Sequence, residues 1–190
     1  MAYKLNYYKL EFTSKFRSYD YAFNILLCQS GIRYIQPLIT HVYSGMRYNT
    51  SVSQIIIYTD GGSRGNPGPS GSGAVVKGLN GKNVASISAF LGVRTNNWAE
   101  YEALILALRA TVDTFGTPVP HPVIVRMDSE LIVRQMKGEY KVKHPVLKEQ
   151  HTKVRALIAE SFPQIKFMHI PREENGEADQ LANEAMDRGV

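Results

Sequence analysis

Two short apolar segments, residues 54–59 (QIIIYT) and 123–127 (VIVRM), are each followed directly by an aspartate. Both segments are rich in β-branched residues, which is typical of buried strands. Between them, apolar side chains recur every three or four positions from residue 98 to residue 115, as on one face of a helix. A strand, a helix and a second strand in this order indicate an α/β fold. If the two strands are parallel neighbours, Asp60 and Asp128 project from the same edge of the sheet, where such folds bind ligands.

The remaining elements follow from local signals. Residues 61–73 (GGSRGNPGPSGSG) are dense in glycine and proline and predict a turn-rich loop after Asp60. Further strands are expected at residues 74–77, 84–91 and 164–170. The helix with the apolar stripe is expected to begin at Thr95 as its N-cap, and others at residues 130–136, 145–161 and 174–188. The expected order of elements is βββαβααβα.

The first 50 residues differ in character from the rest. They hold 8 of the 11 tyrosines, and 6 lysines and arginines against 2 acidic residues, with no sustained hydrophobic period. We expect residues 1–50 to be a poorly ordered N-terminal extension of unknown role, and residues 51–190 to form the functional domain. Met46 could be the native start. A mitochondrial transit peptide and a tyrosine-stacking segment for single strands are alternatives.

The composition limits the possible function classes. Residues 51–190 hold 16 basic and 15 acidic residues, so most of the net charge of +5 belongs to the extension and is no evidence for nucleic-acid binding. The single cysteine, Cys28, excludes an intramolecular disulfide and a cysteine-rich zinc site, and it fits a reducing, cytoplasmic location. No apolar run approaches the roughly 18 residues of a membrane-spanning helix. Nothing indicates an obligate protein partner, and we expect a monomer.

Two carboxylates held a few ångströms apart repel each other unless a cation or a proton lies between them. Oxygen ligands without histidine or cysteine favour a hard cation such as Mg²⁺ or Mn²⁺. Two further acids could join Asp60 and Asp128 in a cluster of four. Glu100 lies beside the apolar stripe near the start of the long helix, and Asp179 neighbours the buried position Ala178 in the last helix. Taken singly, each acid also fits a turn, a cap or a solvated surface.

Four segments stand in a specific order along residues 53–188: YTDGGSRGNPGPSGSGAVV, TNNWAEYEALILALRA, MDSELIVRQMKG and PREENGEADQLANEA. In order and spacing they resemble the type 1 ribonuclease H family, most closely its compact prokaryotic branch. The resemblance implies a ribonuclease H-like fold, a five-stranded mixed sheet with helices on both faces. It implies an endonuclease that hydrolyses the RNA strand of RNA–DNA hybrids with two Mg²⁺ ions, for which Mn²⁺ can substitute, leaving 5′-phosphate and 3′-hydroxyl ends. The metal-binding, catalytic carboxylates of the family fall on Asp60, Glu100, Asp128 and Asp179.

The resemblance also implies how the substrate is recognised. An enzyme that tells RNA from DNA without reading bases must contact the 2′-hydroxyl, which short amides and exposed backbone groups can do. The family pattern assigns such contacts to Ser63, Gly65, Asn66, Asn96 and Asn97. Many members also grip phosphates with a basic, tryptophan-rich protrusion. The matching segment here, KGEYKVKHPV, is short and lacks tryptophan, and leaves Lys137, Lys141 and Lys143 for that task.

A second departure concerns a mobile loop histidine that many members carry before the last catalytic aspartate. The matching loop here, PREENGEAD, has no histidine. His169 lies upstream but is predicted to end a strand, so Arg172 or Glu174 are the candidates to substitute for it. Two other functions remain open: a protein that binds hybrids or double-stranded RNA without cleavage, and another nuclease of the same superfamily. Intact carboxylates argue against the first, because unused negative charge weakens phosphate binding.

Overall fold

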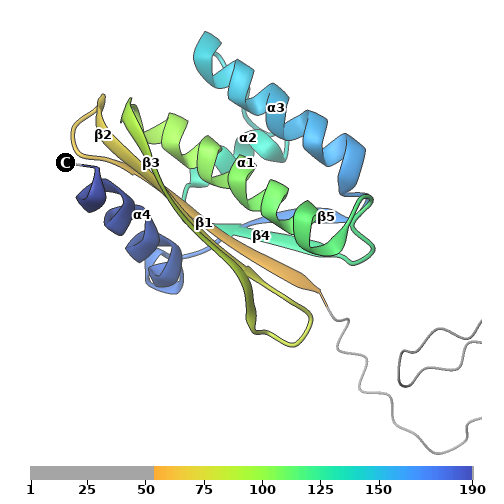
Figure 1. The fold of residues 1–190 in the computed structure, drawn as a ribbon. Helices are drawn as coiled ribbons and strands as arrows, with labels where there is room; N and C mark the ends of the chain where they lie inside the picture. The colour runs from red at the N-terminus through yellow and green to blue at the C-terminus, as the bar shows by residue number, and fades with distance from the viewer. Residues whose placement is uncertain (1–53, 190) are drawn as a thin grey trace, which may run out of the picture. The chain divides into compact units, whose positions relative to one another are not determined.

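A computed structural model describes residues 54–189, which form a five-stranded sheet flanked by helices (Figure 1). The strand order is β3-β2-β1-β4-β5. The strands are β1 (Ile55–Ser63), β2 (Gly68–Lys77), β3 (Asn83–Arg94), β4 (Val123–Met127) and β5 (Ile165–His169). Strands β1, β2 and β3 pair antiparallel, whereas β4 and β5 run parallel to β1. The predicted extension, residues 1–50, lies outside the described residues.

Helices cover both faces of this sheet, as Figure 1 shows. Helices α1 (Asn96–Phe115), α2 (Glu130–Met136) and α3 (Pro145–Ser161) lie on one face, and α4 (Gly176–Arg188) lies on the other. A short 3₁₀ turn, Arg172–Glu174, precedes α4, so the last helix begins later than the predicted residue 174. The predicted order of elements and the mixed five-stranded sheet are confirmed.

The glycine-rich segment is a β-hairpin, so the prediction of a turn-rich loop over residues 61–73 was wrong. Strand β1 continues through Asp60 to Ser63, and β2 already begins at Gly68. The surroundings of Gly73 show why β2 carries a glycine at this position. A Cβ at Gly73 would collide with the backbone of Ala178 and Ala182 in α4, so α4 packs directly on the strand. Glycine therefore serves a close helix–sheet approach at this position and does not mark a turn.

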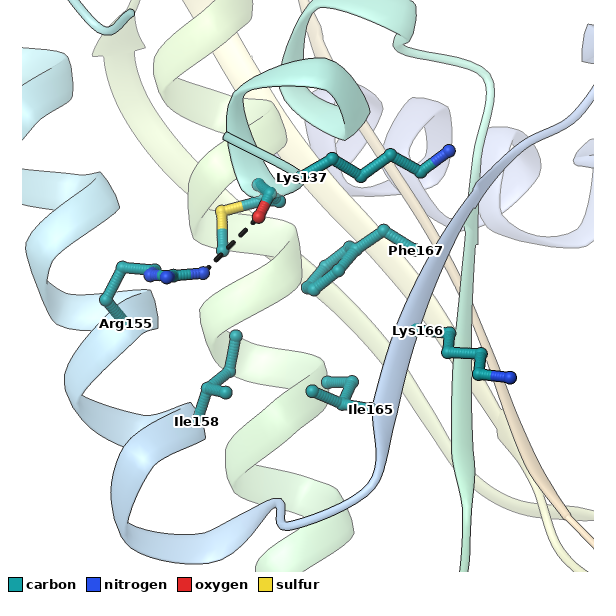
Figure 2. Close-up of a pocket in the computed structure, with 7 residues that line it drawn as sticks. Lys137, Arg155, Ile158, Ile165, Lys166 and Phe167 are labelled. Carbon is teal, nitrogen blue, oxygen red and sulfur yellow. Dashed lines mark hydrogen bonds between the residues drawn. The ribbon is translucent and has the colours of Figure 1, made fainter. Parts of the chain in front are cut away.

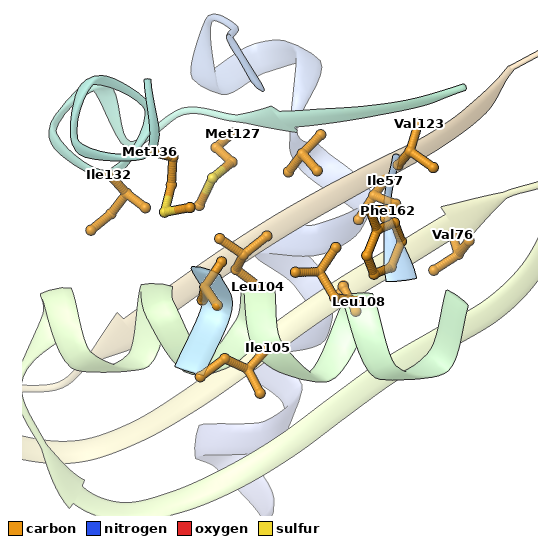
Figure 3. Close-up of a cluster of buried hydrophobic side chains, with 14 of the residues drawn as sticks. Ile57, Val76, Leu104, Ile105, Leu108, Val123, Met127, Ile132, Met136 and Phe162 are labelled. Atoms are coloured by element: carbon orange, nitrogen blue, oxygen red, sulfur yellow. The ribbon is translucent and has the colours of Figure 1, made fainter. Parts of the chain in front are cut away.

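The hydrophobic core lies between the sheet and the face covered by α1, α2 and α3. Alternate residues of β1 and β4 point into it, and α1 contributes the predicted stripe, including Ile105 and Leu108 (Figure 3). Phe162, directly after α3, closes the same cluster. Burial of these side chains fixes α1 across β1 and β2, which places the first turns of α1 at the edge of the sheet where β1 and β4 meet. Within residues 54–189, no helix has the length and apolar character needed to cross a membrane.

Candidate active site

Three of the predicted acids meet at one point. Asp60 lies within β1, Asp128 directly follows β4, and Glu100 lies in the first turns of α1. One carboxylate oxygen of each residue lies within 4.8 Å of one from the other two. The parallel register pairs Thr59 with Met127, so the two aspartates are the next residues along neighbouring strands.

Gly61 allows the third acid to approach. A Cβ at Gly61 would collide with the backbone of Ala99 and Glu100, so α1 can lie this close to β1 only where β1 has no side chain. This contact brings Glu100 beside Asp60, and Glu100 is the more deeply buried of the two, at 5% exposed. A solvated helix acid, the ordinary alternative for Glu100, is therefore excluded.

Burial and mutual repulsion change the acidity of the cluster. Burial, followed by the negative charges of Asp128 and Asp179, raises the pKa of Asp60 to about 6, although Arg172 opposes the change. Burial, with the charges of Asp60 and Asp128, raises the pKa of Glu100 well above its ordinary value. Protons or cations are therefore needed to make this arrangement favourable.

The donor atoms fit a hard divalent cation. All three converging groups are carboxylates, with no nitrogen or sulfur among them. The Oε2 atom of Glu100 is buried and has no hydrogen-bond partner in the described part of the chain. A buried carboxylate oxygen without a donor costs free energy unless a ligand satisfies it. The cluster therefore has the chemistry of a site for a divalent metal ion.

Asp179 is near the three converging acids but is not one of the residues whose oxygens lie within 4.8 Å of one another. It occupies the first turn of α4, and its Oδ1 atom accepts a hydrogen bond of 2.6 Å from Nη2 of Arg172. Its Oδ2 atom accepts a second bond, of 3.0 Å, from Nδ2 of Asn183. Its charge still raises the pKa of Asp60, so it belongs to the same electrostatic site. The expectation of four converging carboxylates is thus met by three, with the fourth held by Arg172.

The hairpin and the start of α1 form one surface. The backbone N–H of Asn96 donates a hydrogen bond of 3.1 Å to Oδ1 of Asn66, at the tip of the β1–β2 hairpin. Thr95 stands at the predicted N-cap position but makes no capping side-chain bond, so Asn66 supplies that bond from outside the helix. The single hydroxyl group of Ser63 lies within hydrogen-bond distance of the carbonyl oxygens of Arg94 (2.9 Å) and Gly65. The remaining predicted contact residue, Asn97, follows in the first turn of α1.

The three predicted lysines are exposed and lie in the segment that starts at the end of α2. Lys137 stands at the rim of a cavity of about 380 Å³ between α3 and β5 (Figure 2). In this cavity Nη1 of Arg155 donates to the carbonyl of Met136 at 3.3 Å, while Lys166 extends from the other side of β5. None of the acids lines the cavity. Lys141 and Lys143 follow in the connection to α3.

Two residues beside Asp128 complete the surroundings. His169 ends β5 as predicted, and its Nε2 atom lies 3.2 Å from the backbone oxygen of Asp128. Asn175, at the N-terminal end of α4, is 1% exposed and donates a hydrogen bond of 2.9 Å to Oδ1 of Asp128. Asn175 was not predicted as a site residue, because an asparagine before a helix has the ordinary signature of an N-cap.

The arrangement defines a class of protein. A mixed sheet of this order, with a carboxylate cluster on two neighbouring parallel strands, is the architecture of ribonuclease H-like proteins. Residues 58–185 match the family described as reverse transcriptase-like. The ribonuclease HI of Halobacterium salinarum is 42% identical over 130 residues, which cover 68% of this chain and 63% of that protein.

Solved structures agree with the sequence comparison. LC11-RNase H1, isolated from compost, is 53% identical with a TM-score of 0.69, over 72% of this chain and 98% of that one. A second structure of LC11-RNase H1, in complex with RNA/DNA hybrid, is 54% identical with a TM-score of 0.68, over 71% and 98% of the two chains. The chain belongs to the type 1 ribonuclease H family.

A longer relative shows that such a domain also occurs in larger proteins. The bifunctional protein Rv2228c of Mycobacterium tuberculosis is 45% identical over 135 residues, which cover 70% of this chain. This chain spans only 36% of the length of that protein.

Proposed function

We propose that this chain is an endonuclease that hydrolyses the RNA strand of RNA–DNA hybrids and leaves 5′-phosphate and 3′-hydroxyl ends. The observation that carries the proposal is the convergence of the carboxylates of Asp60, Glu100 and Asp128 in a type 1 ribonuclease H fold. LC11-RNase H1, which is 54% identical, has been solved in complex with RNA/DNA hybrid, and this supports the substrate.

We infer that these three carboxylates, with Asp179 as a fourth ligand, hold two Mg²⁺ ions, which Mn²⁺ can replace. The oxygen-only donor set and the raised pKa values of Asp60 and Glu100 support a divalent cation. When bound, such ions stabilise the charge of the scissile phosphate and activate the attacking water. The chain itself contributes two buried acids, which are fixed by β1 and α1, and one acid that Asn175 orients.

Hybrid recognition is assigned to the joined surface of the hairpin tip and the start of α1. Asn66 uses its Oδ1 atom to bond Asn96, and its Nδ2 group makes no hydrogen bond to residues 54–189, so that group can donate to a sugar hydroxyl. Ser63, Gly65 and Asn97 flank this pair. Because the hairpin is bonded to α1, it holds these groups at a fixed position relative to Glu100.

Phosphate contacts are assigned to the exposed lysines Lys137, Lys141 and Lys143, which would add salt-dependent affinity without sequence preference. Arg172 is the candidate for the role of the missing loop histidine. It already bonds Asp179, and its side chain is 74% exposed, so it can also reach substrate. We further infer that residues 51–190 form the active domain, with residues 1–50 as an extension of unknown role, and that the protein acts as a monomer in the cytoplasm.

The test is a cleavage assay with labelled RNA–DNA hybrid, double-stranded RNA and double-stranded DNA, each in Mg²⁺, Mn²⁺ or chelator. We expect cleavage of the RNA strand of the hybrid, which is lost with chelator and in the Asp60→Asn variant. A matched control is Asp113→Asn, which changes an exposed acid of α1 and should keep full activity. Binding of hybrid without cleavage in either metal would contradict the proposal and favour a non-cleaving binding protein.

A further inference from the structure

Asn175 is a buried polar residue at the junction of three parts of the acidic site. It is 1% exposed and stands between the 3₁₀ turn and α4, in contact with Thr59 of β1 and with Asp128 directly after β4. A buried amide must be hydrogen-bonded to be tolerated, because desolvation of its polar atoms costs free energy. The partners that satisfy it therefore indicate what the residue does.

The side-chain amide of Asn175 donates both of its hydrogen bonds toward the acids. Nδ2 lies 2.9 Å from Oδ1 of Asp128 and 3.0 Å from the backbone oxygen of Thr59, the residue before Asp60. Both partners are acceptors, so only the NH₂ group can face them and the orientation of the amide is fixed. The Oδ1 atom of Asn175 has no hydrogen-bond partner among residues 54–189, so the stabilising contacts are those of Nδ2.

The backbone of Asn175 contacts the fourth acid. Its carbonyl oxygen accepts hydrogen bonds of 3.1 Å from the backbone N–H groups of Ala178 and Asp179. One residue thus bonds the carboxylate of Asp128, the strand beside Asp60 and the main chain of Asp179. None of these contacts needs the amide to touch substrate.

We infer that Asn175 is a positioning residue, which fixes the orientation of the Asp128 carboxylate and holds the first turn of α4, with Asp179, against it. The inference rests on the proposed metal site and adds a residue to it. A donor that holds one carboxylate oxygen leaves the other directed at the cation, and loss of such an outer contact typically weakens metal binding roughly 10–100-fold. If Asn175 served only to start α4, its substitution would not weaken metal binding in this way.

The test measures metal binding by the free protein, without substrate. Mn²⁺ is titrated into wild type, Asn175→Ala and Asn175→Ser by calorimetry, and the melting temperature is followed with and without Mn²⁺. Serine keeps a good helix N-cap but is too short to reach Asp128, so it preserves the start of α4 if alanine does not. We expect both variants to bind Mn²⁺ roughly 10–100-fold more weakly, and kcat for hybrid to fall while KM stays within about twofold.

Gln150→Ala is the matched control. Gln150 is also a 1% exposed amide, and it donates to Oε2 of Glu102 at 2.7 Å, but it lies on α3. The Gln150→Ala variant should lose stability as the Asn175 variants do, but it should bind Mn²⁺ with the affinity of the wild type. Folded Asn175 variants that bind Mn²⁺ as tightly as wild type would overturn the positioning role alone. A wild-type protein that binds no Mn²⁺ would overturn both this role and the proposed function.

Discussion

Nη2 of Arg172 lies 2.6 Å from Oδ1 of Asp179, and this pair stands next to the three converging acids. The guanidinium is the one nearby positive charge that opposes the raised pKa values of both Asp60 and Glu100 among the described residues. Its removal should therefore leave the acidic cluster with more uncompensated charge.

We predict that Arg172→Ala raises the pKa of Asp60 above its value of about 6 in the metal-free protein. The cause is the loss of a positive charge that favours the ionised carboxylate. Carbon-13 NMR of the side-chain carboxyl groups during a pH titration measures the change. Arg172→Lys keeps the charge and should shift the pKa less. An unchanged titration of Asp60 in the alanine variant would show that Arg172 does not act on the cluster.

Asp60→Asn should stabilise the metal-free protein at neutral pH while it abolishes cleavage. The pKa of Asp60 is about 6 in the folded chain against an ordinary 3.8, so the folded state binds this proton more tightly than the unfolded state. The contribution of Asp60 to the free energy of unfolding of the wild type therefore falls by about 3 kcal/mol as the pH rises from about 4 to above 6. Urea unfolding in chelator should show the variant to be more stable at pH 8 and equal to wild type near pH 3.5. A variant less stable than wild type at pH 8 would contradict the prediction.

Asn66→Ala should lower both stability and substrate affinity. The variant loses the hydrogen bond from the backbone of Asn96, so the start of α1 is less stable by about 1 kcal/mol. Thr95→Ala is the control, because Thr95 makes no capping side-chain bond and its loss should cost little. Thermal unfolding and the KM for hybrid are the measurements. Equal effects of the two substitutions would show that Asn66 is not the functional cap.

Gly73→Ala should destabilise the fold by about 1–3 kcal/mol, because the new methyl group meets the backbone of α4 at Ala178. The rate of hybrid cleavage should fall as well, because Asp179 directly follows Ala178 and would be displaced with it. Gly176→Ala is the control: a Cβ there meets nothing within 4 Å, and alanine favours the helix. Urea unfolding distinguishes the two, and a neutral Gly73→Ala variant would refute the close packing of α4.

A protein that starts at Met46 should keep the hybrid-cleaving activity of the full chain, because every residue assigned to the site lies between Asp60 and Asp179. The comparison is of kcat and KM for hybrid in the two proteins at matched salt concentration. A truncated protein that folds but has lost activity would show that residues 1–45 take part in the function.

The sequence predicted those elements whose signals are local. Strand β4 and helices α2 and α3 have the predicted boundaries, because β-branched runs and Pro145 at the start of α3 mark them directly. Strand β2 was predicted to begin too late, at residue 74, because glycine is rare in strands. The reason for glycine at position 73 is the packing of α4, which comes from a distant part of the chain.

In the candidate active site, too, only the features with a local signal in the sequence could be predicted. The two aspartates that follow apolar strands and Glu100 were predicted to lie together, and the structure brings their oxygens together. The bond from Arg172 to Asp179 and the burial of Asn175 could not be predicted, since both depend on how the turn before α4 packs beneath β1 and β4. Pairing across a fold leaves no period or spacing in the sequence.

The close packing of α4 on strand β2, and with it the position of Asp179, depends on the absence of a Cβ atom at Gly73. Because the strand carries no methyl group at position 73, the backbone of Ala178 packs directly on it, and Asp179 follows Ala178 in the same turn of α4. A substitution of Gly73 therefore reduces activity although all four carboxylates are present. For the same reason, the presence of the acidic residues alone does not show that a relative is active.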